Sequence, residues 1–549
     1  MRIGTVTMPA FHLFAAGIAL TFVTELVAPR AGAAQSGKPR WVLHVENFPG
    51  GISNGVRFSL DPEVIRAQGR HRANVAPPRS VGKRNVQMND DSYPEMPQNE
   101  ESIAYSTDDS LIAVAAANDY VSGGVIVMRT SDGGRHWAST RVTPQFVPTR
   151  DFCTGSDPAV AYSSRDHAFY LSQLCFFRAA TPSEVHVFKS LDNGATWTPG
   201  RQAAVAATNV DKQGNVDDSF FNDKEYIAVD NTPTSPHYGR LYVTYTRFHI
   251  SDPNTGFSDS CPIQLSYTDN VPSQDPSQTV WNHVSVVPDD FGDNGVGPSA
   301  NQFSVPVVQT NGHLDIAYVL EECNTSLDHG LRFQRSKDGG TSFLKEPVRV
   351  NKPGQWADNP NPDDLIPNTK FRAPNTVSLA YSPKTGTLAY VYTNYISGRG
   401  KGNIDVSLSH DGGKTWSDAQ TISLQGGAPA PNNQFFPWIA ATPSGDFVAI
   451  WLDRRQDPSN HDIGTFEARS TDDGNTWKNV NISTTTWNPD LGFFKSGAFI
   501  GDYSGIAAND SVTYPTWTDG RHSNIANTGI GETDVFTDVE INRTATAQQ

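Results

Sequence analysis

The chain has 549 residues, a formal net charge of -16 at pH 7, and 37% hydrophobic and 18% charged residues. Its 45 glycines and 37 prolines favour many short strands joined by turns over long helices. The acidic balance and the lack of a basic cluster exclude nucleic acid as a partner, and an anionic ligand would have to be held by local arginines.

The first 34 residues are predicted to be a secretory signal peptide. Arg2 supplies a positive charge, residues 11–23 (FHLFAAGIALTFV) form an apolar run, and residues 31–34 (AGAA) offer a cleavage site. A membrane anchor is the alternative, but the run is shorter than the roughly 20 residues that a bilayer requires. No other segment reads as a membrane span, so we expect a secreted protein.

Residues 35–83 are predicted to be an N-terminal extension, followed by the main domain at 84–549. Within the extension, 41–48 (WVLHVENF) is expected to form an extra strand, because apolar and β-branched residues dominate it. The Arg- and Pro-containing stretch 66–83 is expected to be irregular linker.

Five copies of one eight-residue signature follow the pattern Ser/Thr-x-Asp-x-Gly-x-x-Trp/Phe. They are TSDGGRHW (130–137), SLDNGATW (190–197), SKDGGTSF (336–343), SHDGGKTW (409–416) and STDDGNTW (470–477). Each aspartate is expected to accept hydrogen bonds from backbone amides two residues on, and each glycine to supply the positive φ of a tight turn. The closing Trp or Phe buries a large ring. The five aspartates are Asp132, Asp192, Asp338, Asp411 and Asp472.

These signatures are identified as Asp-boxes of the bacterial neuraminidase repeat, and the chain resembles the sialidase-like β-propeller superfamily. The resemblance rests on five matched copies across most of the chain. It implies an all-β propeller in which the box is a structural turn on the face opposite the active site. Function must therefore be sought in other loops.

Strand patterns predict seven four-stranded blades. Upstream of each box lies an alternating strand such as 403–409, preceded by a more continuously apolar pair such as 376–393. Two further units keep this pattern without a box. They lie at 224–246 with 262–269, and at 499–519 with 533–541.

The last blade ends after its third strand, so it needs an outer strand from elsewhere. Residues 84–89 (RNVQMN) resemble 478–483 (KNVNIS), which follow Trp477 as a fourth strand. We predict that 84–89 complete blade seven and close the ring, which removes an exposed sheet edge.

Four cysteines in an exported chain indicate two disulfides. Cys153 and Cys175 flank the first two strands of one blade, whereas Cys261 and Cys323 fall at equivalent loop ends of consecutive blades. We expect pairing of 153 with 175 and of 261 with 323, because only this pairing keeps both bridges local. Four buried free thiols are the alternative.

Propeller topology sorts the loops onto two faces. The four strands of a blade are lettered A to D in chain order, with A next to the central axis. The A-to-B and C-to-D turns, and hence the boxes, share one face, which we call the box face. The B-to-C loops and D-to-A connectors share the other, which we call the connector face. Function is expected at the connector face, where the loops are longer and more varied.

Two B-strand ends share the motif Trp-x-Asp-x-Arg, in WLDRR (451–455) and WTDGR (517–521). The planar fork of arginine suits carboxylate recognition. The motif therefore makes a set of rim residues candidates for binding an acidic sugar. The alternative is that each aspartate pairs with its own arginine and fixes the loop. The candidates are Asp453, Arg455, Asp519 and Arg521.

Two D-to-A connectors resemble sialidase motifs. KFRAP (370–374) resembles Phe/Tyr-Arg-Ile-Pro, which implies that Arg372 holds a substrate carboxylate. GDYSG (501–505) resembles the segment that carries the sialidase nucleophile, which implies that role for Tyr503. Familiar sialidases have six blades and carry the arginine motif in the first, whereas here it falls in the fifth of seven.

A tyrosine with a pKa of about 10 needs a carboxylate to take its proton before it can act as a nucleophile. Asp502, Glu225 and Glu321 are candidates for that base. Asp223 is the natural candidate for the acid that protonates a leaving group.

Two histidines and two acidic loops carry weaker signals. His461 and His522 lie on connector-face loops and could abstract protons in a polysaccharide lyase. The acidic loops 288–295 and 358–364 could hold a structural calcium ion. No zinc pattern or phosphate loop is present, so no cofactor is expected.

The favoured function is a secreted, monomeric glycoside hydrolase that acts on terminal acidic sugars of glycans. A non-catalytic propeller that binds glycan or protein, and a polysaccharide lyase, are the alternatives. The hydrolase predicts arginines that converge around Tyr503. Arginines that are each paired to their own aspartate favour a binding module.

Overall fold

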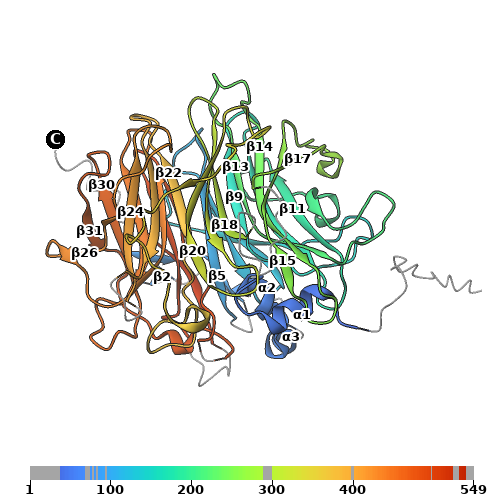
Figure 1. Cartoon of the computed structure of the whole chain (residues 1–549), viewed down its shortest axis with the longest axis horizontal. Helices are drawn as coiled ribbons and strands as arrows, with labels where there is room; N and C mark the ends of the chain where they lie inside the picture. Colours follow the sequence, from blue (N-terminus) through green and yellow to red (C-terminus); the bar gives the residue numbers. More distant parts are fainter. Residues whose placement is uncertain are drawn as a thin grey trace, which may run out of the picture.

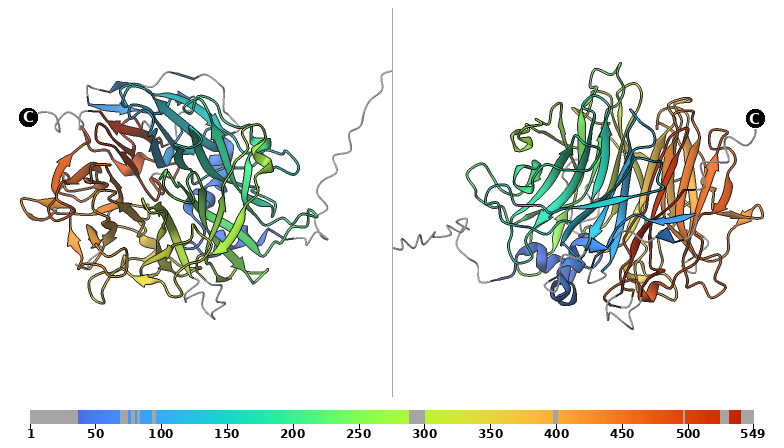
Figure 2. Two further views of the ribbon diagram at one scale, coloured as in Figure 1. Left: turned by 90° about the horizontal axis from the view of Figure 1, so that it is seen from above. Right: turned by 180° about the vertical axis from the view of Figure 1, so that it is seen from behind.

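The computed structural model describes residues 37–68, 75–76, 80–81, 84–92, 96–287, 300–396, 401–495, 497–523 and 531–539. It is a seven-bladed β-propeller of antiparallel blades (Figures 1 and 2), as the sequence predicts. The predicted signal peptide at 1–34 lies outside the described residues. No described helix is both long and apolar enough to cross a membrane.

The strands of each blade follow one another in chain order. Blade one comprises β5 (Gln98–Tyr105), β6 (Ala113–Asp119), β7 (Gly124–Thr130) and β8 (Ala138–Val142). Blade two comprises β9 (Ala159–Ser163), β10 (Ala168–Phe176), β11 (Ser183–Ser190) and β12 (Ala204–Thr208). Blade three comprises β13 (Phe220–Val229), β14 (Leu241–Ile250), β16 (Ile263–Thr268) and β17 (Asn282–Ser285), with β15 (Ser258–Ser260) paired to β14.

The second half of the ring repeats this order. Blade four comprises β18 (Asn301–Val308), β19 (Leu314–Glu321), β20 (Asp328–Ser336) and β21 (Val348–Arg349). Blade five comprises β22 (Val377–Tyr381), β23 (Leu388–Asn394), β24 (Asn403–Ser409) and β25 (Gln420–Thr421). Blade six comprises β28 (Gln434–Ala441), β29 (Phe447–Asp453), β30 (Gly464–Ser470) and β31 (Lys478–Asn481), and blade seven contains β32 (Gly505–Ala508), β33 (Thr513–Asp519) and β34 (Asp534–Asp538).

Short elements fill the connections. A small hairpin precedes blade six. Of the four 3-10 turns in the described chain, the first two lie between the third and fourth strands of blades two and three, and the last two lie between blades. The hairpin is β26 (Leu424–Gln425) with β27 (Ala428–Pro429), and the turns are η1 (Gly200–Gln202), η2 (Pro276–Gln278), η3 (Pro362–Asp364) and η4 (Pro489–Leu491).

The inner strands form a closed ring around the axis, because each contacts the next and β32 contacts β5. The outer edge of blade seven is supplied from the N-terminal side. There β3 (Asn85–Gln87) pairs with β34, with Asn85 opposite Asp538, and β2 (Ser80–Val81) pairs with β3. Sequence-distant ends therefore share one sheet.

The middle strands are buried along their length because neighbouring blades pack on both of their faces. All nine residues of β10 and all seven of β29 are buried. Trp451 of β29, for example, lies in a cluster that joins strands of blades five and six. The core is thus a set of layers between blades, which holds the inner strands rigidly in place.

The five signature turns differ in detail from the expected pattern. Asp411 Oδ1 accepts from the amides of Lys414 and Thr415, both at 3.0 Å, which lie three and four residues on. The amide two residues on, that of Gly413, instead donates to the hydroxyl of Ser409 at 2.8 Å. The expected amide partner was wrong because the serine hydroxyl is closer to it. The predicted positive φ is present in all five glycines, namely Gly134, Gly194, Gly340, Gly413 and Gly474.

The extension folds into three helices rather than the predicted strand and linker. They are α1 (Arg40–Asn47), α2 (Asn54–Ser59) and α3 (Pro62–Gln68). The expected strand at 41–48 was wrong because Trp41, Val42 and Val45 lie at helical spacing and bury one face. The expected linker 66–83 contains the end of α3, β1 (Val75–Ala76), which pairs with β4 (Asp91–Ser92), and β2.

Both predicted disulfides are present. Cys153 and Cys175 have Cα atoms 5.3 Å apart, and those of Cys261 and Cys323 are 5.7 Å apart. Both bridges join segments near the connector face, where they add a covalent link to loops that also pack in hydrophobic clusters. Two disulfides favour an oxidising compartment.

Candidate functional site

Each blade contributes one equivalent residue at the connector-face end of its inner strand. This residue lies near the start of the strand. It is six positions before a polar residue at the opposite end, for example Ser106 in blade one or Ser163 in blade two. The seven residues are Glu100, Asp157, Lys224, Phe303, Thr376, Phe436 and Tyr503.

The backbone at this position is unusual. Five of the seven residues have φ between 50° and 63°, although none is glycine. In four blades the ladder between the inner strand and its neighbour slips at this position, as in a β-bulge. Bulges re-aim side chains, and a non-glycine residue with positive φ is strained, so the repeated feature marks a functional candidate.

The re-aimed side chains meet near the axis. The ammonium of Lys224, in blade three, lies 3.8 Å from the ring centroid of Tyr503, in blade seven. Glu100 accepts from the backbone amide of Asp502 at 3.1 Å and from the Asn118 side chain at 2.5 Å. Blades one, three and seven are thus connected at one point.

Two acids of blade three, Asp223 and Glu225, face the same space. Asp223 Oδ2 accepts from Gln302 Nε2 at 3.1 Å, whereas its Oδ1 has no hydrogen-bond partner among the described residues. Glu225 is fully buried, and neither of its carboxylate oxygens has a partner in the described part of the chain. Burial and the neighbouring Asp157 raise the pKa of Asp223 to about 7 and raise the pKa of Glu225 well above its usual value.

The predicted nucleophile is buried in this cluster. Tyr503 is 1% exposed, and its hydroxyl has no hydrogen-bond partner among the residues that the structure describes. Burial, followed by the charges of Glu100 and Asp157, raises the pKa of Tyr503 well above 10. The phenol therefore needs a repositioned base before it can ionise.

Arg372 reaches the cluster but is already paired. Its Nε and Nη2 donate to the two carboxylate oxygens of Asp502 at 3.0 and 2.5 Å, and its side chain is 6% exposed. Burial opposes its charge, yet Asp502 and then Glu321 raise its pKa above the ordinary value. The fork that would hold a substrate carboxylate is occupied by a protein carboxylate.

The two rim arginines lie away from this cluster. Arg455 contacts Asp453 at 2.6 Å and stacks 3.9 Å from the centroid of Phe466. Arg521 repeats this arrangement with Asp519 at 2.6 Å and Phe536 at 4.3 Å. The geometry is that of the loop-fixing alternative, and a role in substrate binding stays a prediction.

The two histidines and one of the two acidic loops lie in described parts of the chain. His461 contacts Asp462 and Asp490, and His522 contacts Asp534. Loop 288–295 lies outside the described residues. Loop 358–364 is described, but it is not among the groups of His, Cys, Asp and Glu that lie close enough to hold an ion in the described chain.

Sequence reasoning missed Glu100, Asp157 and Lys224. These residues occupy the same position in their inner strands. That equivalence is visible in the sequence only when the strands are aligned on the polar residue at their C-terminal ends. The residue types at this position vary from acid to aromatic, so no motif reveals it. The bulge, which decides the direction of the side chain, is invisible in the sequence.

Comparisons with known proteins give the chain neither a family nor an activity. No family model matches the chain, and no curated protein matches it. Among solved structures, a Hadza microbial sialidase is 12% identical with a TM-score of 0.41, and the match covers 78% of this chain and 73% of that one. A GH93 α-L-arabinofuranosidase of Fusarium graminearum is 12% identical with a TM-score of 0.43 over 83% and 98% of the chains. The NanB sialidase from Streptococcus pneumoniae is 10% identical with a TM-score of 0.40 over 85% and 71%.

Proposed function

We propose that this chain is a glycoside hydrolase whose active site is the buried carboxylate cluster around Tyr503. The supporting observation is Glu225, a fully buried carboxylate whose two oxygens have no partner among the described residues. Leaving a charge unsatisfied in a core is costly, and such groups concentrate at catalytic sites. Glu225 also lies close enough to Tyr503 to influence its pKa.

The proposed chemistry uses three groups. Asp223, whose pKa is raised to about 7, is protonated in part at neutral pH and donates that proton to the leaving glycosidic oxygen. Tyr503 oxygen bonds to the anomeric carbon as the glycosidic bond breaks. Glu225 takes the phenol proton, which requires that it first release to solvent the proton that burial favours on it. Water, deprotonated by the Asp223 carboxylate, then displaces the tyrosine oxygen, which recovers its proton from Glu225.

Specificity for acidic sugars is the finer part of the proposal. It requires Arg372 to exchange Asp502 for a substrate carboxylate, with or without help from Arg455 and Arg521. Export and a monomeric state are likewise proposed, the former on the predicted signal and the two disulfides.

Purified protein should be screened for hydrolysis of sialosides, uronic-acid glycans and neutral arylglycosides. We expect turnover to fall at least 100-fold in Tyr503→Phe, because only the reacting oxygen is removed. The melting temperature should change little, since that hydroxyl has no hydrogen-bond partner to lose. Full activity in Tyr503→Phe would remove Tyr503 from the mechanism.

A non-catalytic glycan-binding propeller is the second candidate. It is favoured by the rim arginines, each of which is paired with its own aspartate. Binding of glycans without any turnover, by wild type and by Asp223→Asn alike, would support this alternative and reject the hydrolase.

A further inference from the structure

The three N-terminal helices lie at the lower edge of the molecule in Figure 1, near the label of β5. Figure 2 shows the same helices at that edge from behind. The turn that leads into α2 enters the candidate site: Ile52, Ser53, Asn54 and Gly55 are all buried. We call residues 40–68 the plug.

The plug contacts the proposed catalytic acids directly. The backbone amide of Ser53 donates to Asp223 Oδ2 at 2.8 Å, and the Ser53 hydroxyl donates to Asp157 Oδ2 at 3.2 Å. Gly55 follows so closely that a Cβ atom there would lie 3.1 Å from Glu100 Oε2 and 3.2 Å from Asp157 Oδ2. One short turn therefore touches the acids of blades one, two and three.

The chemistry of this contact is that of a neutral hydrogen-bond donor. The inserted residues carry no charge, and they present a hydroxyl and an amide to carboxylates. Around them lie Glu100, Asp157, Asp223 and Glu225, whereas Lys224 is held over Tyr503. Carboxylates prefer hydroxyl and amide donors and repel an anion at short range.

The anchors of the plug lie away from the acids. Trp41 stacks on Phe221 with centroids 5.1 Å apart and meets Phe176 edge-on at 5.5 Å. At the other end, Phe58 stacks on Phe499 at 5.2 Å. Apolar packing holds the plug together with polar contacts outside the site, such as Trp41 Nε1 to Ala180 O at 3.1 Å and Lys495 to Asp61 at 2.7 Å. The turn at 52–55 is the part that fills the polar site.

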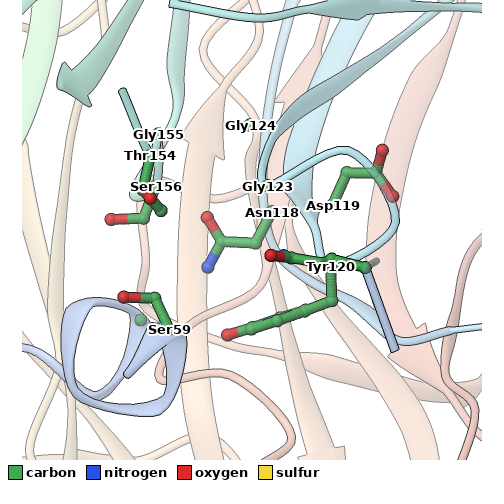
Figure 3. Close-up of a pocket in the computed structure, with 11 residues that line it drawn as sticks. Ser59, Asn118, Asp119, Tyr120, Gly123, Gly124, Thr154, Gly155 and Ser156 are labelled. Atoms are coloured by element: carbon green, nitrogen blue, oxygen red, sulfur yellow. The ribbon is translucent and has the colours of Figure 1, made fainter. Parts of the chain in front are cut away.

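The seam between plug and ring is not filled completely. A pocket lies there, lined by Ser59 from the plug and by Asn118, Tyr120 and Ser156 from blades one and two (Figure 3). Figure 3 shows Ser59 and the Tyr120 ring on facing sides of this space. A polar, incompletely packed seam can separate at lower cost than a continuous apolar interface.

We propose that the plug occupies the ligand site of its own chain. The Ser53 hydroxyl then takes the place of a hydroxyl group of a neutral sugar. The chain is then a latent form, and it accepts neutral, hydroxyl-bearing glycans when the plug moves aside. This specificity competes with the acidic-sugar specificity proposed above, which would need the exchange of Asp502 at Arg372. The inference rests on the proposed location of the site but not on hydrolysis, because binding alone would reveal it.

The test uses the full chain with Gly55→Gln, whose Cβ alone would crowd Glu100 Oε2 at 3.1 Å and Asp157 Oδ2 at 3.2 Å and whose longer side chain should lift the turn. The matched control is Gly37→Gln, the same change on a glycine with no atom within 4 Å of the added Cβ. Hydrogen exchange reports whether amides 50–58 open. Binding is measured to paired glycans that share one core, with and without a terminal sialic acid.

We expect Gly55→Gln to speed exchange at 50–58 and to raise binding of neutral glycans at least 10-fold, with Gly37→Gln matching wild type. If Gly55→Gln fails to fold, Trp41→Ala loosens the plug at its anchor and serves in its place. Opened amides without any gain in neutral binding would overturn the proposal, as would a gain confined to the sialylated glycans.

These outcomes separate the two proposals. Binding gained without turnover keeps the plug and rejects the hydrolase. Turnover in wild type that Gly55→Gln leaves unchanged keeps the hydrolase and rejects the plug, because the site would then already be open.

Discussion

In the cluster around Tyr503 the acidic side chains outnumber the basic ones. This imbalance determines which carboxyl groups keep a proton. Lys224 lies over the Tyr503 ring, and the neighbouring Asp502 takes the Arg372 fork. With few counter-charges, burial keeps protons on the remaining carboxyl groups. A proton held on Asp223 near neutral pH is what an acid catalyst requires.

The same burial predicts how stability depends on pH. The folded-state pKa of Asp223 is raised to about 7, above its unfolded value of about 4, so the folded protein binds this proton more tightly. The Asp223 proton therefore contributes to the free energy of unfolding at low pH, and this contribution is lost as the pH rises from about 4 through 7. We expect Asp223→Asn, which stays neutral, to lose less stability than wild type over this range.

Denaturant unfolding between pH 4 and 8 provides the measurement. Asp411→Asn is the contrasting control, because hydrogen bonds from Thr415 and Ser409 outweigh partial burial and lower the pKa of Asp411 to about 2. Its contribution is present above about pH 4 and is lost as the pH falls towards 2. Parallel curves for wild type and Asp223→Asn would contradict the assignment of Asp223.

At the scale of elements, the sequence predicted turns whose contacts lie within a few residues. It did not predict which way side chains of distant blades point. The turn at 409–416 could be read from its own residues, because Ser409, Asp411 and Gly413 satisfy one another within five positions. The meeting of Lys224 with Tyr503 depends on a bulge in blade three and on the packing of that blade near blade seven, which is distant in sequence. Helix α1 was missed because a short apolar run has no decisive period.

The signature turns should therefore affect stability and leave the site unchanged. Replacing Asp411 with Ala removes the acceptor for two backbone amides and for the Thr415 hydroxyl. By analogy with helix caps we expect a loss of about 1 kcal/mol in unfolding free energy. Glycan binding or turnover should be retained, because these turns lie on the box face. A selective loss of activity at unchanged stability would contradict this separation.

At the scale of the whole molecule, one strand joins the two ends of the chain. β3 pairs with β34, and Asn85 also bonds to blade six through Ile482 O at 2.8 Å and the amide of Thr484 at 2.7 Å. The outer strand β31 of blade six is joined to β30 by a single short turn. Closing a ring across more than 400 residues of sequence costs far more entropy than closing that turn.

Two equivalent prolines test whether this closure governs stability. Val86 and Val480 occupy matching positions in RNVQMN and KNVNIS, and each lies on an outer strand. Proline disrupts either strand, but only Val86→Pro loosens a contact that no nearby covalent link restores. We therefore expect the denaturation midpoint to fall further in Val86→Pro than in Val480→Pro, with both disulfides intact in the two variants. Equal midpoints would mean that contacts between neighbouring blades hold the ring together without the β3 strand, and that the packed layers alone determine the stability of the propeller.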